Sequence, residues 1–425
     1  MSADTARKAG ILVVGGGIMG AAIAKAAAHL CDPLEAPLVL LEKSGLAAGS
    51  TGRSGAILRC FYSDEALVRL AHESLREWSL FESLVGRPIG FERQGVLTIG
   101  GPRAGGTREL VERNAALLVA CGVEAELVGG AEARRRFGVQ VADEALCCHE
   151  PAGAGVDPLR ACEAFAAVAR EAGAVTRLGA RVLAIEREGA RVARVRTSEG
   201  DWIADQVVVA AGPWAGPLLS STGFEAGLRV VRPEQYAIAQ PPRPAPESVE
   251  ALSTIADAGM ERWSSSRVVA MRAAHPVLLD LEGGAYARCE GHAGRTRVGA
   301  MDHLRDETVP DPDRVDEVVG EDFRRWARER LVERLPEYER QAERQSFVGL
   351  YTLSPDGQPL LGRAPGFSNL FVAVGFSGHG FKLAPGVGAG MAQLLAGDPC
   401  TAFDARFFDP ARFAAGAAKA GSFGL

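Results

Sequence analysis

The chain has 425 residues, of which 47% are hydrophobic and 24% charged, and its formal net charge is −6. This ordinary composition predicts a globular protein with enough sequence for two or three domains. The mild acidity argues against nucleic-acid binding, and no run of 18 apolar residues is present to predict a membrane-spanning helix. The eight cysteines form no CxxC pair or zinc-type cluster, so we expect free thiols and no structural metal. The N-terminus lacks an apolar core of signal-peptide length, so we expect a cytoplasmic protein.

The N-terminal segment has the pattern of a βαβ unit. Residues 11–14 (ILVV) are a continuous apolar strand, and residues 15–20 (GGGIMG) follow as a glycine turn. Residues 21–30 (AAIAKAAAHL) are strong helix formers, and residues 37–43 (PLVLLEK) predict a second buried strand. Strand, turn, helix and strand in this order predict the start of a nucleotide-binding sheet.

The glycine turn fits the GxGxxG pattern. In that pattern Gly15 permits the tight turn, Gly17 lets a pyrophosphate approach the helix N-terminus, and Gly20 allows the helix to pack closely on the strand. Glu42 ends the second strand, where a carboxylate can accept hydrogen bonds from ribose hydroxyls. Because the turn lies between a strand and a helix and Glu42 follows it, we predict a dinucleotide site.

Two further segments favour FAD over NAD as the dinucleotide. A long polar and glycine-rich loop, residues 43–59, follows the second strand and has the length to wrap a larger cofactor. A third apolar strand, within residues 205–212, ends in the small residues Ala210, Ala211 and Gly212. Three separated contact segments suit a large ligand that is buried deep in the sheet.

The middle of the chain alternates predicted helices and strands. The apolar spacing and the flanking glycines and prolines predict helices over residues 64–84, 105–122, 129–138 and 156–174. A β-hairpin arm is expected over residues 90–100, and alternating strands with hairpin turns over residues 180–212.

These patterns divide the chain into two domains. Residues between 226 and 345 mix predicted strands with a predicted helix over residues 314–335, and their sequence pattern differs from that of the glycine-rich segments on either side. We therefore predict one discontinuous FAD-binding domain and one substrate domain. The first is expected to contain residues 1–90, 150–225 and 346–425, and the second residues 91–149 and 226–345.

Near the C-terminus, an apolar strand leads into a glycine-dense turn (NLFVAVGFSGHGFKLAPGVGAG, residues 369–390). Glycine this dense is entropically costly unless something approaches the backbone closely. We expect Gly375, Gly378 and Gly380 to let the backbone pass a flavin ring. A helix is predicted from about Pro385, a residue suited to a first turn, with its positive end toward the flavin.

These motifs, taken in order along nearly the whole chain, resemble the D-amino-acid oxidase superfamily of FAD-dependent amine and amino-acid oxidoreductases. The sarcosine oxidases, both monomeric enzymes and heterotetrameric β-subunits, are the most similar branch, with glycine oxidase and dimethylglycine dehydrogenase as relatives. The segments that carry the resemblance are VVGGGIMGAAIA with LLEK, GSTGRSGAILRCFYS, GVDPLRACEAFAAVAREAGA, ADQVVVAAGPWA, YTLSPDGQPLLGRAP and GFSGHGFKLAPGVG.

The resemblance implies an α/β fold with a glutathione-reductase-type Rossmann FAD-binding domain. It also implies a smaller α+β substrate domain whose mixed or antiparallel sheet covers one face of the flavin. The implied reaction is hydride transfer from a C–H bond beside nitrogen to flavin N5, which gives an imine that hydrolyses.

The resemblance also assigns roles to four candidate catalytic residues. Arg59 matches the arginine that helps to hold the substrate carboxylate in monomeric sarcosine oxidase, and Lys382 matches its lysine partner. Both side chains can donate charge-assisted hydrogen bonds to a carboxylate. Tyr351 matches a tyrosine near the flavin, and Arg297 stands where a lysine speeds reaction with oxygen. An arginine there keeps the charge and changes geometry and hydration.

The cofactor is expected to be held without a covalent bond. Sarcosine oxidase ties its flavin to a cysteine two places before the tyrosine, where this chain has Gly349, and Arg53 stands at the histidine position of dimethylglycine dehydrogenase. The motifs and the resemblance together assign the following residues to FAD contact: Gly15, Gly17, Ile18, Met19, Gly20, Glu42, Lys43, Ser50, Thr51, Arg53, Ser54, Gly55, Val182, Ala211, Gly212, Trp214, Gly349, Gly378, His379, Gly380, Phe381 and Lys382.

The leading hypothesis is oxidation of a small amine or amino acid that bears a carboxylate, such as an N-methyl, secondary or D-amino acid. The electrons would pass to O2 or to an electron-accepting protein, and a dehydrogenase subunit of a larger complex is one alternative. A 2-hydroxy-acid oxidoreductase is a second alternative, because Arg59 and Lys382 would recognise only the carboxylate of the substrate. A flavin-binding protein without turnover is the third. Tyr286 and Arg288 are further candidates for the pocket, and the sequence leaves the substrate and the oligomeric state open.

Overall fold

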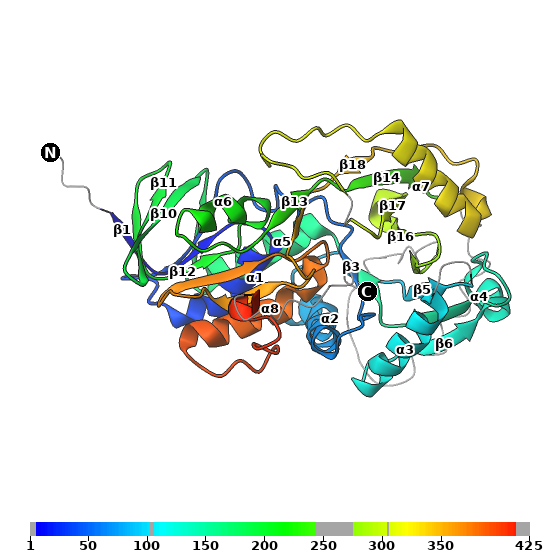
Figure 1. The fold of residues 1–425 in the computed structure, drawn as a ribbon, viewed down its shortest axis with the longest axis horizontal. Coiled ribbons are helices and arrows are strands. Elements are labelled where there is room, and N and C mark those ends of the chain that lie inside the picture. The colour runs from blue at the N-terminus through cyan, green and yellow to red at the C-terminus, as the bar shows by residue number, and fades with distance from the viewer. Residues whose placement is uncertain (1–5, 103–105, 243–274, 304–305, 414–425) are drawn as a thin grey trace, which may run out of the picture.

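The computed structural model describes residues 6–102, 106–242, 275–303 and 306–413, which form two lobes (Figure 1). Each lobe has one eight-stranded sheet. The first sheet contains β1 (Arg7–Val14), β2 (Leu38–Glu42), β9 (Val175–Leu178), β10 (Val182–Glu188), β11 (Arg191–Thr197), β12 (Trp202–Val209), β20 (Leu360–Arg363) and β21 (Leu370–Val374).

The topology of the first sheet brings the predicted contact segments together. Its strands follow the order β10-β11-β12-β1-β2-β9, and β21 pairs with β12 and β20. β1 pairs in parallel with β2 on one side and with β12 on the other. The carboxyl ends of these three strands, Val14, Glu42 and Val209, therefore meet at one edge, where open α/β sheets bind their ligands.

Four helices pack against one another on one side of this sheet (Figure 1). They are α1 (Ile18–Ala27), α2 (Glu65–Val85), α5 (Pro158–Glu171) and α8 (Gly380–Ala396). The predicted start of α5 is confirmed: the Asp157 carboxylate accepts hydrogen bonds from the amides of Leu159 and Arg160. A separate apolar core fills the opposite face of the sheet, under α6 (Ala215–Ser220) and the η2 turn (Gly212–Trp214).

The second lobe has a mixed sheet in the order β18-β14-β17-β16-β15-β5-β7-β6, in which only β5 and β15 pair in parallel. Its strands are β5 (Val96–Gly100), β6 (Glu126–Gly129), β7 (Leu146–Glu150), β14 (Glu234–Ala239), β15 (Val277–Asp280), β16 (Ala285–Glu290), β17 (Arg295–Ala300) and β18 (Phe347–Val348). The helices of this lobe are α3 (Thr107–Ala120), α4 (Gly130–Phe137) and α7 (Glu321–Arg334), and α7 buries Ala327 and Leu331 in the core of the lobe.

Smaller elements complete the described chain. β3 (Ile57–Leu58) and β4 (Glu92–Arg93) both pair with β8 (Ala154–Gly155), and β13 (Arg229–Val231) pairs with β19 (Tyr351–Leu353). The short 3-10 helices are η1 (Ala28–Leu30), η4 (Gly291–Ala293), η5 (Pro336–Tyr338) and η6 (Pro410–Phe413). Among the described residues, no helix has both the length and the apolar character needed to cross a bilayer.

The fold-class prediction, a Rossmann-type α/β unit with a second sheet-based unit, is confirmed. The exact domain boundaries remain a prediction, and residues 243–274 and 414–425 within them lie outside the described residues. The sheets follow that division in most places, because the strands within residues 91–149 and 226–345 join the second sheet, apart from the short β4 and β13. They depart from it at β18, which lies within residues 346–425 and pairs with β14 of the second sheet.

The predicted hairpin over residues 90–100 is wrong. β4 and β5 belong to different sheets, because the amides of Gln94 and Gly95 both donate to the carbonyl of Gly153 and the chain turns away between the two strands. The predicted helix over residues 314–335 begins later, at Glu321. Before it, Asp311 and Asp316 side chains accept hydrogen bonds from nearby amides, a local pattern that competes with a helix.

Candidate active site

The glycine turn between β1 and α1 is fixed by contacts with the protein itself. Gly15 has a φ of +113°, and a Cβ atom there would lie 2.5 Å from the carbonyl oxygen of Ala210. A Cβ atom on Gly20 would lie 1.9 Å from the carbonyl oxygen of Gly15, so only glycine lets α1 pack on the turn. Gly17 caps α1, and the next amide, that of Ile18, donates to the Thr51 hydroxyl at 3.0 Å.

Glu42 holds this turn from the neighbouring strand. Its carboxylate accepts a hydrogen bond from the amide of Gly16 at 2.8 Å and another from the amide of Ser44 at 2.8 Å. The side chain also lines the cavity that opens above the turn. Glu42 therefore stabilises the turn, in addition to its expected contact with a ribose.

The edge where β1, β2 and β12 end opens into a cavity of about 670 Å³, a size typical of ligand pockets. Most of the predicted cofactor residues lie on its wall: Gly15, Gly17, Ile18, Met19, Glu42, Lys43, Ser50, Thr51, Arg53, Ser54, Val182, Ala211, Gly212, Trp214, Gly378, Gly380 and Phe381, together with Tyr351. A glycine-lined edge at the N-terminus of a helix, with a carboxylate at the next strand end, fits a dinucleotide.

The remaining predicted residues do not line this cavity; they are Gly20, Gly55, Gly349, His379, Lys382, Arg59 and Arg297, together with the further candidates Tyr286 and Arg288. Gly20 packs beneath the turn, and Gly349 lies against Pro233 and Gln235. Gly55 faces the ring of Tyr286 on the second sheet. The others lie in two buried charged clusters, one near α8 and one on the second sheet.

The C-terminal glycine turn also needs glycine because other parts of the protein lie close to its backbone. Gly375 and Gly378 have φ values of +71° and +85°, and both line the cavity. A Cβ atom on Gly378 would lie 2.7 Å from the ring of Tyr351, so the turn passes over this side chain.

The helix after this turn begins at Gly380, earlier than predicted, and Pro385 lies inside α8 and not in its first turn. A proline there removes one amide donor and disturbs the helix. Two side chains of α2 bond to the backbone at this point: Trp78 donates to the carbonyl of Lys382, and Ser74 accepts from the amide of Gly386. This support lets the helix extend back through Lys382.

Arg59 and Lys382 both lie near one aromatic side chain, that of Tyr62. The Arg59 guanidinium is 4.5 Å from the centre of the Tyr62 ring, and the Lys382 ammonium is 5.8 Å from it. Both side chains are buried, and Lys382 donates to the carbonyl of His379 at 3.3 Å. Burial, followed by the charge of Arg59, lowers the pKa of Lys382 well below its usual value.

His379 is held in one neutral tautomer. Its Nε2 lies 3.0 Å from the carbonyl oxygen of Gly357, which can only accept, so Nε2 carries the proton. Its Nδ1 then accepts from the Tyr62 hydroxyl at 3.4 Å. Burial and the charge of Lys382 lower the pKa of His379 to about 3, so the imidazole orients Tyr62 and stays uncharged.

Glu150 is a member of this cluster that the sequence did not reveal. It ends β7, is fully buried, and accepts a hydrogen bond from the amide of Cys60 at 2.6 Å. Burial raises its pKa to about 7, although the charges of Arg59 and Lys382 oppose the shift. Glu150 is separated by about 90 residues or more from both cations, so no local pattern linked them.

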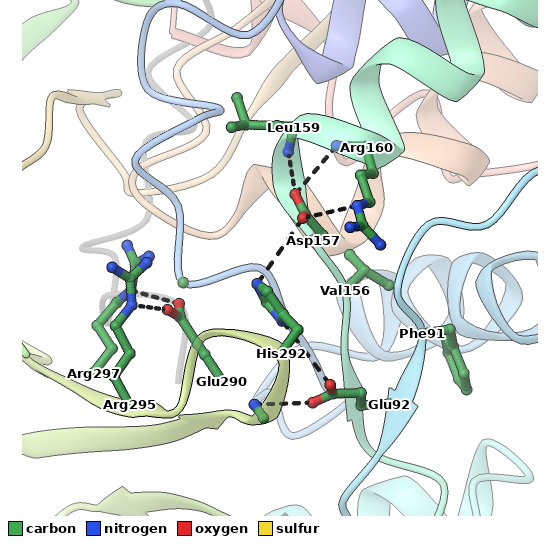
Figure 2. Close-up of polar contacts among 12 residues, drawn as sticks. Phe91, Glu92, Val156, Asp157, Leu159, Arg160, Glu290, His292, Arg295 and Arg297 are labelled. Carbon is green, nitrogen blue, oxygen red and sulfur yellow. Dashed lines mark hydrogen bonds and ion pairs between the residues drawn. The ribbon is translucent and has the colours of Figure 1, made fainter. Parts of the chain in front are cut away.

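Arg297 lies in the second cluster, on the sheet face of β16 and β17 (Figure 2). It donates to the Glu290 carboxylate at 2.7 Å, to Gln235 Oε1 at 2.7 Å and to the carbonyl of Arg53 at 3.0 Å. Arg295 also pairs with Glu290, at 2.5 Å. The charge expected at residue 297 is therefore matched by a buried carboxylate.

Tyr286 and Arg288 share this sheet face with Arg297, as the strand register requires. The Tyr286 and Tyr351 hydroxyls interact, and burial raises the pKa of both. Arg288 is buried and donates to the carbonyl of Val156 at 2.9 Å, and also to that of Gly55. Arg288 thus joins the two lobes.

Comparisons with known proteins identify the family. The model of the FAD dependent oxidoreductase family (DAO) matches residues 10–394. The chain belongs to this family. Its cofactor is FAD, as the sequence predicted, and family members are oxidases and dehydrogenases of amino acids and related amines.

Individual relatives are distant. Human mitochondrial dimethylglycine dehydrogenase is 28% identical over 97% of this chain and 45% of its own length. Human peroxisomal sarcosine oxidase is 25% identical over 90% of this chain and 91% of its own length. The chain thus spans about half the length of the dimethylglycine dehydrogenase. The crystal structure of L-proline dehydrogenase from P. horikoshii covers 97% of this chain and 100% of its own, with a TM-score of 0.81 and 24% identity, and shows the shared fold.

Proposed function

We propose that this protein oxidises a small amine or amino acid that carries a carboxylate, of the N-methyl, secondary or D-amino-acid class. The observation that carries this proposal is a pair of buried basic side chains, Arg59 and Lys382, that both lie within 6 Å of the centre of the Tyr62 ring. Two relatives bear names of enzymes for N-methylated glycines, dimethylglycine dehydrogenase and sarcosine oxidase, which supports the substrate class.

The cationic pair has the properties needed to bind a carboxylate. Two basic side chains act electrostatically on one buried carboxyl group, Glu150, whose pKa of about 7 leaves it partly protonated at neutral pH. A substrate carboxylate would accept charge-assisted hydrogen bonds from Arg59 and Lys382 in a region that excludes water. Binding of the anion would also favour the protonated, charged form of Lys382.

FAD held at this site would supply a hydride acceptor for the carbon beside the amine nitrogen. The chain's own residues orient the substrate and keep the site dry. His379 is neutral and already hydrogen bonded on both ring nitrogens, so we assign it to positioning Tyr62 and not to proton transfer. A neutral amine needs no base for hydride loss. Tyr351, on the cavity wall, is proposed to border the flavin, and the FAD to be held without a covalent bond.

The experiment is anaerobic reduction of the flavin by a panel of N-methyl, secondary and D-amino acids and 2-hydroxy acids. We expect bleaching with at least one amino acid, and about 100-fold lower efficiency for Lys382→Met, because a buried charged hydrogen-bond donor is lost. Lys25→Met, which removes a lysine paired with Glu77 on the helix side, should react as the wild type does.

Bleaching by hydroxy acids alone would identify the 2-hydroxy-acid oxidoreductase alternative. An unchanged rate and substrate affinity in Lys382→Met would overturn the proposed role of the cationic pair. After reduction, comparison of O2 with an artificial acceptor would show whether the electrons leave to oxygen or to a protein.

A further inference from the structure

A segment of the second lobe extends over the dinucleotide cavity. Residues 309–320, here called the strap, connect the region after β17 to α7. At its start, the amide of Val309 donates to the carbonyl of Val230 at 2.8 Å. At its end, the amide of Gly320 donates to Glu234 Oε1 at 2.7 Å. Both ends are therefore fixed to β13 and β14, and residues between them contact the first lobe.

The middle of the strap is held by Asp313. Its carboxylate accepts from Trp214 Nε1 at 3.0 Å and from Arg181 at 2.7 Å, and it pairs with Lys43. The Lys43 ammonium also lies 3.6 Å from the centre of the Trp214 ring. Three separate segments of the first lobe thus converge on one carboxylate, and the hydrogen bonds from Arg181 and Lys43 lower the pKa of Asp313 to about 2.

A second acidic residue of the strap makes a parallel contact. Glu317 pairs with Arg53, whose guanidinium also donates to the carbonyl of Val348 at 3.0 Å. The strap lines the same cavity as the glycine turn, through Pro310, Asp311, Pro312, Asp313, Val315 and Glu317. Its two prolines restrict the backbone and lower the entropy lost when the strap closes.

The partners of the strap are residues that also line the dinucleotide cavity, namely Lys43, Arg53, Arg181 and Trp214. A ligand in the cavity therefore lies between the glycine turn and the strap. We propose that Asp313 and Glu317 are cofactor-retaining residues, and that FAD leaves only when their contacts with the first lobe break. This inference rests on the FAD site alone and is independent of the substrate.

The contacts of Asp313 and Glu317 with the first lobe are weak enough to break and form again. Asp313 is 35% exposed on its side chain and Glu317 is 65% exposed, so water screens each ion pair and a single pair contributes little. Asp313 has three donors and should contribute more than Glu317. Loss of both residues should accelerate FAD release without changing either sheet.

The test uses the complete holoprotein and measures FAD release by the rise in flavin fluorescence after dilution into an excess of a flavin-scavenging apoprotein. We expect release to be about 10-fold faster in Asp313→Ala, about threefold faster in Glu317→Gln, and faster still in the double variant. Asp322→Asn, a change at an exposed aspartate of α7 that lies outside the strap, should release FAD at the wild-type rate.

A second measurement needs no variant. Raising NaCl from 0.05 to 1 M should accelerate FAD release from the wild type several-fold, because salt screens exposed ion pairs. The same change should have little effect on the double variant. Release rates that agree within twofold in the wild type, the double variant and Asp322→Asn would overturn the proposal. Equal salt dependence in the wild type and the double variant would also overturn it.

Discussion

Asp313 and Glu290 belong to two clusters with the same plan, one carboxylate between two basic side chains, and they differ in exposure. Asp313 lines the cavity, and its side chain is 35% exposed. Glu290 lies within the second sheet, where its side chain is 2% exposed (Figure 2). The pKa of each is held at about 2, that of Asp313 by hydrogen bonds and that of Glu290 by neighbouring positive charges that outweigh burial.

The difference in exposure gives the two carboxylates different uses. Water can replace the partners of Asp313, so its contacts can open and close at low cost. No water can replace those of Glu290, so loss of its charge would leave buried guanidinium groups without compensation. The first cluster suits a contact that opens for the cofactor, and the second suits a rigid support for the second sheet.

The largest effect that this comparison predicts is on stability. Glu290→Gln should lower the free energy of unfolding by about 3–5 kcal/mol, because it removes the charge that faces Arg295 and Arg297. The midpoint of urea unfolding of the holoprotein measures this loss. Glu65→Gln, which breaks an exposed pair with Arg69 on α2, is the matched control and should change stability by less than about 1 kcal/mol.

The pH dependence of this contribution has a definite sign. The pKa of Glu290 is depressed in the folded state, so its stabilising effect is present above its ordinary value and is lost as the pH falls toward about 2. The wild type should therefore lose its stability advantage over Glu290→Gln in acid. Equal unfolding midpoints for Glu290→Gln and Glu65→Gln at pH 7 would contradict the assignment.

An effect of intermediate size is expected on the affinity for a carboxylate ligand, through Glu150, a third carboxyl group near two basic side chains. Its pKa is raised to about 7 by burial, so the folded protein takes up a proton as the pH falls through 7, and the positive charge near Arg59 and Lys382 increases. A carboxylate ligand should then bind about three- to tenfold more tightly at pH 6 than at pH 8. Acetate titration of the holoprotein, followed by the flavin absorbance, measures this affinity.

Glu150→Gln should reduce this pH dependence, since the amide cannot ionise, and any dependence that remains is assigned to Lys382, whose pKa burial lowers. Glu77→Gln, a change on the surface of α2, should retain it. The stability of the wild type should also fall as the pH rises from about 4.5 to 7, because the folded pKa is above the unfolded one. An acetate affinity that is the same at both pH values in the wild type would contradict the role given to Glu150.

The smallest expected effect is on the rate of FAD release, through the exposed cluster around Asp313. Lys43→Gln removes one of the three donors to Asp313 and should accelerate FAD release about two- to threefold. Because the pKa of Asp313 is about 2, the carboxylate stays ionised and the release rate of the wild type should be constant between pH 5 and pH 8. A release rate that changes several-fold across this range would show that another group controls the strap.

The local parts of this molecule were predictable because their causes are local. A strand, a glycine turn and a helix are specified by residues that are neighbours in the chain, and the structure has them at β1, Gly15 to Gly20 and α1. The start of α5 was equally predictable, because the Asp157 cap bonds amides two and three residues away. The later start of α7 was missed because side chain–backbone hydrogen bonds within the strap compete with a helix there. The earlier start of α8 was missed because side chains of α2, a distant segment, bond to its first turns.

The sequence by itself determined the nucleotide-binding turn, the presence of a second sheet and the family, and therefore the cofactor. Only the tertiary structure decided which charges meet. Glu150 lies beside Arg59 and Lys382, and Asp313 beside Lys43 and Arg181, across separations of 90 to more than 200 residues. The physical reason is that a carboxylate's partners and its access to water are set by packing between distant segments, and these two factors decide whether it supports the fold, tunes a binding site or acts as a latch.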